Sequence, residues 1–189
     1  MDSETNLKSL QEAYEPYQMP DAGGDKGTAH SYIDIYGKEI PAEKNVSLLE
    51  IGVWAGHSLK MWADYLPDSR IVGLDIDLSK VVFEPEGFEL LLCDATKHAQ
   101  IKEKLSGTFD YIIDDGSHKA NDQIDTFYYL WDYLKVGGKY FIEDVISMDI
   151  ANDLARKIYN FTGIKPQVYD LIYVKGRSDD VLIQVTKIN

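Results

Sequence analysis

Cysteine is almost missing from this sequence of 189 residues, in which Cys93 stands alone. One thiol cannot close an intrachain disulfide, and it cannot supply the several sulfur ligands of a structural zinc site. The sequence therefore excludes a small disulfide-stabilised fold and the multi-cysteine metal motifs.

Positive charge is scarce as well. The chain has 19 Lys and Arg residues against 32 Asp and Glu residues, which gives a formal net charge of -13. The basic residues are scattered along the sequence, and an acidic protein repels the phosphates of nucleic acids and of anionic membranes. We therefore expect no nucleic-acid partner and no membrane partner.

Long hydrophobic runs are also missing. No stretch of about 18 apolar residues exists to span a bilayer, and the first residues, M-D-S-E-T, lack the apolar segment of a signal peptide. The expected location is the cytoplasm. The length suits one domain, with an N-terminal helix and a lid or cofactor loop over residues 1–45 and an α/β core over residues 46–189.

Two acidic strand ends carry most of the functional information. They are Phe109–His118, F-D-Y-I-I-D-D-G-S-H, and Tyr140–Asp144, Y-F-I-E-D. Each is a short apolar run, typical of a buried strand in a parallel sheet, that ends in carboxylates. A helical pattern over residues 124–134 lies between them, and the pair Gly137-Gly138 indicates its end. The two strands would be neighbours, so their acids would meet at one edge of the sheet.

A second pattern, near the start of the core, is typical of a nucleotide-binding turn. Val46–Gly52 is predicted to be the first strand, and the turn Glu50–Gly56, E-I-G-V-W-A-G, leads into a helix. Glycines let the backbone approach a ligand, and the free amides at a helix N-terminus favour an anion. The spacing E-x-G-x-x-x-G differs from the G-x-G-x-x-G of dinucleotide enzymes.

Two further strands end in acids that suit a nucleoside. The strand Arg70–Leu74 ends at Asp75, the position where α/β nucleotide folds hold a ribose. The strand Phe88–Leu92 is followed by Asp94, which would either reach an adenine amino group or cap the next helix.

The remaining segments are predicted from periodicity and turn residues. A helix is expected over Ser3–Tyr14 with Ser3 as its N-cap, and the composition of Asp21–Tyr32 favours a solvated loop. A helix is expected from about Asp149 to Phe161. Two final strands, Gln167–Val174 and Val181–Lys187, form a hairpin, so one of them runs antiparallel.

Together these motifs resemble the class I S-adenosylmethionine-dependent methyltransferases. More specifically, D-K-G-T-A-H-S-Y, V-G-L-D-I-D, I-I-D-D-G-S-H and F-I-E-D resemble the metal-dependent sugar O-methyltransferases of macrolide biosynthesis, the mycinamicin and macrocin type. The resemblance implies one α/β, Rossmann-like domain whose seven-stranded, mostly parallel sheet ends in a C-terminal antiparallel hairpin. It also implies methyl transfer from S-adenosylmethionine to a sugar hydroxyl.

The resemblance further implies which residues hold the ligands. Mg2+ would be bound by Asp115, Glu143 and Asp144, and His118, beside Asp115, would be the general base. S-adenosylmethionine, which becomes S-adenosylhomocysteine, would be bound by a longer set: Lys26, His30, Glu50, Gly52, Gly56, Asp75, Asp94 and Asp114.

The residue types suit this chemistry. Clustered carboxylates repel one another unless a cation joins them, a hard cation acidifies a bound hydroxyl, and a neutral imidazole can take the proton. Trp54, Asn121, Gln123 and Tyr32 are weaker candidates for an acceptor pocket, because such residues more often serve packing.

Several alternatives stay open from the sequence. The acceptor would be a sugar or another small molecule, including an amine or a non-sugar hydroxyl. A nicotinamide oxidoreductase is disfavoured by the glycine spacing, and a non-catalytic cofactor-binding subunit is a further alternative. A homo-oligomer is compatible with an amphipathic N-terminal helix and 13 tyrosines.

Overall fold

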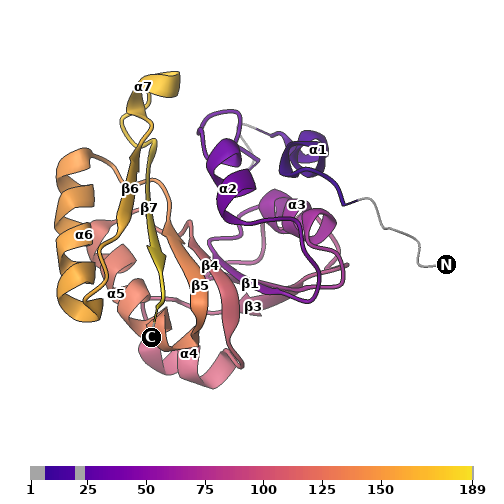
Figure 1. Cartoon of the computed structure of the whole chain (residues 1–189). Coiled ribbons are helices and arrows are strands. Elements are labelled where there is room, and N and C mark those ends of the chain that lie inside the picture. The colour runs from indigo at the N-terminus through magenta and orange to yellow at the C-terminus, as the bar shows by residue number, and fades with distance from the viewer. Residues whose placement is uncertain (1–6, 20–23, 189) are drawn as a thin grey trace.

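The computed structural model describes residues 7–19 and 24–188, in which a central sheet is covered by helices on both faces (Figure 1). The seven strands lie in the order β3-β2-β1-β4-β5-β7-β6. Their bounds are β1 Ser47–Ile51, β2 Arg70–Asp75, β3 Glu89–Leu92, β4 Phe109–Asp114, β5 Leu134–Ile142, β6 Gln167–Asp170 and β7 Val181–Thr186. Strands β1 to β5 are parallel and β7 is antiparallel to both of its neighbours, which confirms the predicted fold class.

The helices form a layer on each face of the sheet. Helices α1, α2 and α3 contribute to one buried cluster, and α4, α5 and α6 to the other. Their bounds are α1 Leu10–Tyr14, α2 Ile33–Glu39, α3 His57–Tyr65, α4 His98–Lys104, α5 Ala120–Leu130, α6 Met148–Thr162 and α7 Ile172–Lys175, with 3-10 turns η1 Glu15–Tyr17 and η2 Trp131–Tyr133.

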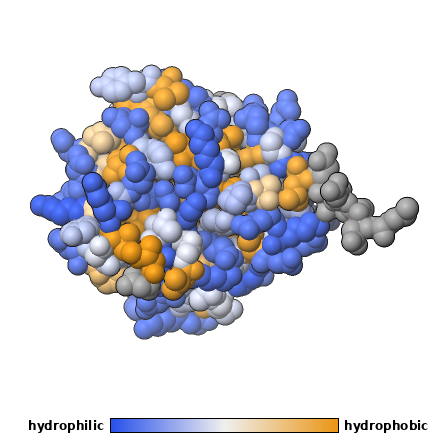
Figure 2. Space-filling view, in the orientation of Figure 1, coloured by the Kyte–Doolittle hydropathy of each residue, from blue (hydrophilic) through white to orange (hydrophobic). Residues whose placement is uncertain are grey.

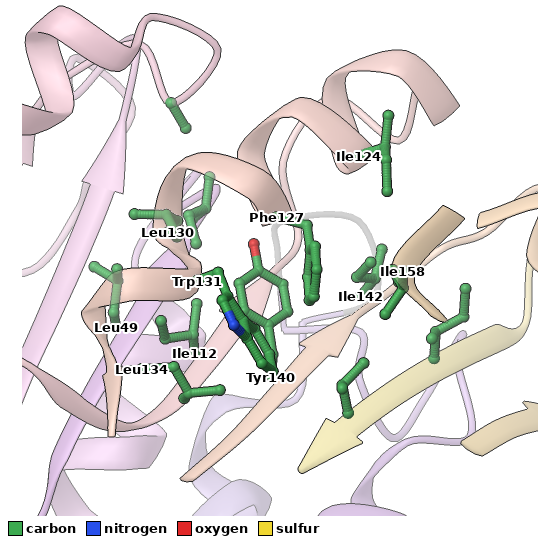
Figure 3. Close-up of a cluster of buried hydrophobic side chains, with 14 of the residues drawn as sticks. Leu49, Ile112, Ile124, Phe127, Leu130, Trp131, Leu134, Tyr140, Ile142 and Ile158 are labelled. Carbon is green, nitrogen blue, oxygen red and sulfur yellow. The ribbon is translucent and has the colours of Figure 1, made fainter. Parts of the chain in front are cut away.

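Alternating side chains of each central strand supply the two cores. Ile112 and Tyr140 join the cluster beneath α5, where Figure 3 shows them grouped with Phe127. Ile113 and Phe141, the next residues along the same strands, join the cluster beneath α1, α2 and α3. Burial on both faces explains why these strands have continuous apolar sequences.

The predicted end of the helix after β4 is wrong. Helix α5 ends at Leu130, and Leu134 is the first residue of β5, where it pairs with Phe109 of β4. The pair Gly137-Gly138 therefore lies inside β5 rather than after a helix. An apolar residue at helical spacing fits a strand equally well, and tertiary pairing decides between the two.

Two other boundaries differ from prediction. Strand β6 ends at Asp170, and residues up to Lys175 form the short helix α7 instead of more strand. Helix α1 begins at Leu10 because Ser9 and Glu12 form a capping box. The predicted N-cap Ser3 lies outside the described residues.

Helix α2 was not predicted at all. Its sequence, I-D-I-Y-G-K-E, places Gly37 inside the helix, where glycine weakens the signal. Its buried residues, Ile33 and Tyr36, face the sheet in the cluster beneath α1, α2 and α3.

The surface is mainly hydrophilic. Figure 2 shows one face on which polar residues dominate and hydrophobic residues form small separate groups. Within the described residues, no helix combines the length and apolar character that crossing a bilayer requires.

Candidate functional site

A cavity of about 750 Å³ opens where the parallel strands end. This volume lies in the range of about 300–1,000 Å³ that small-molecule sites occupy. Residues that follow β1, β2, β3, β4 and β5 line it, and so do residues of α5 such as Gln123. The lining contains these predicted site residues: Gly52, Asp75, Asp94, Asp114, Asp115, His118 and Asp144.

The glycine turn after β1 brings two strand ends close together. Gly52 has a φ of 85°, and a Cβ atom at this position would lie 1.8 Å from the carbonyl oxygen of Asp115. Gly56, at a φ of 86°, is the N-cap of α3. Both glycines therefore satisfy backbone requirements that other residues meet poorly, and Gly52 places the turn against the end of β4.

Asp75 and Asp94 shape the cavity wall with their carboxylates. Asp75 Oδ2 accepts hydrogen bonds from the backbone N–H groups of Val53 at 2.7 Å and Trp54 at 3.1 Å. Asp94 Oδ1 accepts from the backbone N–H of Thr96 at 2.9 Å in a turn before α4, and the residue lines the cavity. The helix-capping alternative is wrong, because the N-cap of α4 is Lys97.

The acidic ends of β4 and β5 meet, as the sequence predicted. Ligand atoms of Asp115, His118 and Asp144 all lie within 4.8 Å of one another, and we call these three residues the outer group. His118 Nε2 is 3.2 Å from Asp115 Oδ1, and His118 Nδ1 is 3.6 Å from Asp144 Oδ2. His118 and Asp144 have φ values of 57° and 52°, a backbone conformation that non-glycine residues adopt mainly where surrounding structure enforces it.

A second acidic cluster lies behind the outer group. Lys26 Nζ donates to Asp115 Oδ2 at 2.7 Å and to Glu143 at 2.8 Å, and it lies 3.1 Å from Glu50 Oε1. We call Glu50, Asp115 and Glu143 the inner group. Lys26 and Glu50 are 2% and 0% exposed. The expectation of a solvated loop is therefore wrong at Lys26, and a direct contact of either residue with a cofactor stays a prediction.

His30 lies on the far side of Asp144. Its Nδ1 atom is 3.2 Å from Asp144 Oδ1 and 3.7 Å from Asp180 Oδ1, and its ring stacks on Tyr32. The hydroxyl of Tyr32 donates to Asp144 Oδ1 at 2.8 Å. His30 is buried, so the structure places it beside a predicted metal ligand, while cofactor contact stays a prediction.

Burial and mutual charge shift the pKa values at this edge. The hydrogen bond to Asp115 raises the pKa of His118 to about 9, against some lowering by burial. Burial, with the nearby Asp115 carboxylate, raises the pKa of Asp144 to about 6, and burial raises that of Asp114 to about 7. Burial alone would raise the pKa of Asp115, but the nearby Lys26 and His118 outweigh this effect and hold its pKa below the usual value.

The outer group fits a divalent cation by its donor chemistry. It offers carboxylate oxygens, which hard cations prefer, from Asp115 and Asp144 at the wall of an open cavity. Glu143 lies deeper, where it also accepts a hydrogen bond from the hydroxyl of Tyr36 at 2.5 Å.

Sequence reasoning missed three residues that support this site. Tyr36 binds Glu143, the hydroxyl of Ser58 donates to Glu50 at 2.7 Å, and Asp180 accepts from the backbone N–H of Ser31 at 3.0 Å. Recognising α2 would have pointed to Tyr36. Asp180 lies in the loop before β7, and no sequence motif marks it.

Comparisons with known proteins agree with this architecture. No protein-family model matches the chain. The chain is 33% identical over 131 residues to a demethylmacrocin O-methyltransferase of Streptomyces fradiae, an alignment covering 63% of this chain and 33% of that protein. It is 32% identical over 131 residues to a mycinamicin VI 2''-O-methyltransferase of Micromonospora griseorubida, covering 63% and 32%. The chain thus spans about a third of the length of these curated relatives.

Solved structures share the fold. A methyltransferase from the mycinamycin biosynthetic pathway, in complex with Mg, SAH and mycinamycin VI, superposes with a TM-score of 0.75 at 23% identity, over 97% of this chain and 54% of that one. An O-methyltransferase from Bacillus cereus in complex with SAH gives 0.63 at 16% identity, over 95% and 90%. The chain has the class I methyltransferase fold, and its curated homologues are O-methyltransferases of the mycinamicin and macrocin type, as the sequence motifs indicated.

Proposed function

We propose that this chain is an S-adenosylmethionine-dependent O-methyltransferase that acts on a sugar hydroxyl, with a bound Mg2+ ion and His118 as general base. The observation that carries the proposal is the position of the outer group, Asp115, His118 and Asp144, on the wall of a cavity that also contains Gly52 and Asp75. The residues proposed to bind the methyl donor, Gly52 and Asp75, therefore line the same cavity as the proposed base, His118.

Asp115 and Asp144, with Glu143 behind them, are the proposed holders of the metal ion. When bound, such an ion supplies electrostatic stabilisation for a hydroxyl that loses its proton. Carboxylates at the ends of two adjacent strands can converge on one point because β4 and β5 pair directly, with Asp114 opposite Ile142.

His118 is the proposed acceptor of the hydroxyl proton. Methyl transfer from a sulfonium is an in-line displacement, so the protein must hold the acceptor oxygen opposite the departing sulfur and remove its proton. The His118 ring lies 3.2 Å from Asp115, which fixes its orientation and stabilises the imidazolium form after proton transfer.

The proposed cofactor region is the part of the cavity along β1, β2 and β3. Gly52 lines this region and Gly56 is the N-cap of α3 at the end of the same turn. Asp75 is the candidate for the ribose hydroxyls, and Asp94 is the candidate for the adenine. Asp114 lines the same cavity between this region and the outer group.

A sugar acceptor is favoured by the names of the curated relatives. One methylates the 2'' oxygen of mycinamicin VI, and another, from Streptomyces antibioticus, is an L-olivosyl-oleandolide 3-O-methyltransferase with 30% identity over 131 residues. Cytoplasmic location, homo-oligomerisation and the lack of nucleic-acid and membrane partners stay predictions from the sequence.

Methylation assays with labelled S-adenosylmethionine test the proposal. A panel of glycosides, simple amines and non-sugar alcohols is supplied with Mg2+ or with a chelator. We expect turnover on glycosides that depends on Mg2+, and a loss of at least about 100-fold in His118→Ala, as for removal of a general base.

Other outcomes would redirect the assignment. If the rate of methyl transfer is the same with chelator as with Mg2+, the metal role is rejected. If only the amines are methylated, the sugar acceptor is rejected. Thermal stabilisation by NAD but not by S-adenosylhomocysteine would favour an oxidoreductase instead.

A further inference from the structure

Lys26 places a positive charge inside a cluster of three carboxyl groups. Its Nζ atom is 2.7 Å from Asp115 Oδ2, 2.8 Å from Glu143 Oε1 and 3.1 Å from Glu50 Oε1. An ammonium group has three N–H donors and no acceptor, so three carboxylates match its bonding capacity.

The inner group gathers residues that are remote in sequence. Glu50 is the second-last residue of β1 and pairs with Ile113 of β4, which in turn pairs with Phe141 of β5. Ile113 and Phe141 face the cluster beneath α1, α2 and α3. Asp115 lies two residues after Ile113, and Glu143 lies two residues after Phe141. The alternation of side chains therefore directs Asp115 and Glu143 to that same face. The turn that contains Lys26 contacts these residues at the carboxyl ends of the strands.

Burial makes the ammonium group necessary. Glu50 and Glu143 are 0% and 2% exposed, so neither carboxyl group is solvated by bulk water, and Lys26 Nζ lies within 3.1 Å of both. Lys26 is itself 2% exposed, and its Nζ atom lies within 3.1 Å of an oxygen of each of the three carboxyl groups, an arrangement that favours the ammonium form. Without Lys26, the three acids would face one another with no compensating charge.

We propose that Lys26 is a positioning residue whose ammonium group is a built-in cation: it holds Glu50, Asp115 and Glu143 together, in the place where a second metal ion would otherwise be needed. Asp115 belongs to both groups, so Lys26 fixes one of its oxygens inside while the other faces His118 in the outer group. The inference rests on the proposed function only for the ion at the outer group, since the role of Lys26 itself requires no metal.

The full chain with Lys26→Met tests this role, because methionine keeps the apolar stem and removes the charge. In the presence of a chelator, we expect Lys26→Met to melt about 10 °C below wild type. A fall of this size is typical when a protein of this length loses one partner of a buried ion network. Added Mn2+ should raise the melting temperature of Lys26→Met by more than it raises that of wild type, because the metal ion supplies the missing positive charge.

A matched control is Lys139→Met. Lys139 Nζ binds Glu39 Oε2 at 3.0 Å, and its side chain is 24% exposed. This variant loses a lysine–carboxylate contact outside the inner group, so its response to Mn2+ should equal that of wild type. A melting temperature of Lys26→Met within about 2 °C of wild type in chelator, or an equal response to Mn2+, would overturn the proposal.

A second variant keeps the test decisive if Lys26→Met folds poorly. Glu50→Gln removes one carboxylate, so it should lower the melting temperature of wild type but raise that of Lys26→Met. If Glu50→Gln shifts the melting temperature in the same direction in wild type and in Lys26→Met, Lys26 does not act as a built-in cation. The same conclusion follows if neither Mn2+ nor Glu50→Gln restores the folding of Lys26→Met. If Glu50→Gln has the expected opposite effects but Mn2+ does not change the melting temperature of wild type, only the proposed metal site is rejected.

Discussion

His118 lies between two carboxylates, and its protonation state reports the charge of the cavity edge. The pKa of about 9 arises mainly from the hydrogen bond to Asp115, so the ring is an imidazolium at pH 7 when these carboxylates lack a metal ion. A cation that neutralises them must lower this pKa. We expect a fall of about one unit or more when Mg2+ is added, which moves His118 toward the neutral form that a general base needs.

An NMR titration of the histidine rings, in chelator and in Mg2+, measures this change. The control is His98, the exposed first residue of α4, whose ring stacks on Tyr129 of α5. His98 should keep its chemical shifts when Mg2+ is added. A His118 pKa that is the same in both solutions would contradict metal binding at the outer group.

Asp114 and Asp110 lie on the same strand but respond oppositely to pH. Burial raises the pKa of Asp114 from 3.8 to about 7, so folding binds a proton between these values and stability falls as pH rises through that window. Asp114→Asn removes this loss. In chelator we expect a melting temperature higher than wild type by about 5 °C at pH 8 and little change at pH 4.

Asp110→Asn is the control of opposite sign. Burial alone would raise the pKa of Asp110, but Lys135 at 2.7 Å and the N–H of Ser47 outweigh it and hold the pKa below 3.8. Its stabilising effect is present above the unfolded pKa and is lost as pH falls through the folded value. Asp110→Asn should therefore melt below wild type at pH 8. Equal shifts of the two variants would contradict the assigned environments.

The chemistry-bearing residues were predictable because acids after apolar strands stand out from the packing pattern. Asp115, His118 and Asp144 meet at one edge because β4 and β5 are parallel neighbours. The burial of Lys26 was not predictable, because its turn has a polar, glycine-rich composition and its partners lie 24 to 117 residues away in sequence, as the contacts with Glu143 at |i−j| = 117 illustrate. Local composition contains no information on such distant contacts.

The turn after β1 leaves no space for a side chain at Gly52. Gly52 and Gly137 have nearly equal φ values of 85° and 84°, but a Cβ atom on Gly52 would collide with the Asp115 carbonyl, whereas one on Gly137 meets nothing within 4 Å. Gly137→Ala should lose about 1–2 kcal/mol of stability from backbone conformation alone. Gly52→Ala should lose more than about 3 kcal/mol and weaken S-adenosylhomocysteine binding.

Urea denaturation of both variants separates the two effects, because the φ requirement is shared and only the collision differs. Equal losses would show that β1 and β4 separate easily at their ends. That result would also weaken the proposed link between the cofactor turn and the outer group.

The strands were predicted from the sequence more accurately than the segments that connect them. Central strands are buried on both faces, so β1, β2 and β4 have apolar runs that nothing else explains. The start of β5 and the segment α7 depend on pairing partners: Leu134 pairs with Phe109, and the pairing of β6 with β7 stops at Asp170. Helix α2 escaped detection because it is short and contains Gly37.

The whole molecule carries a net charge of -13, so general screening and specific ion binding must be separated. Monovalent salt screens self-repulsion among all the surface carboxylates and should raise the melting temperature of any variant. Mg2+ at the same ionic strength should add a further rise, since an ion bound only by the folded state stabilises it by about 2.7 kcal/mol at one hundred times its dissociation constant.

Asp144→Asn assigns that further rise to the outer group. Asparagine tolerates the φ of 52° at this position and changes the net charge of the chain by only one, so the response to monovalent salt should be preserved. The extra stabilisation by Mg2+ should disappear, because the metal loses a carboxylate ligand at the end of β5. If Asp144→Asn keeps the full response to Mg2+ at matched ionic strength, the ion binds elsewhere on the acidic surface, and the proposed metal-assisted methyl transfer loses its structural basis.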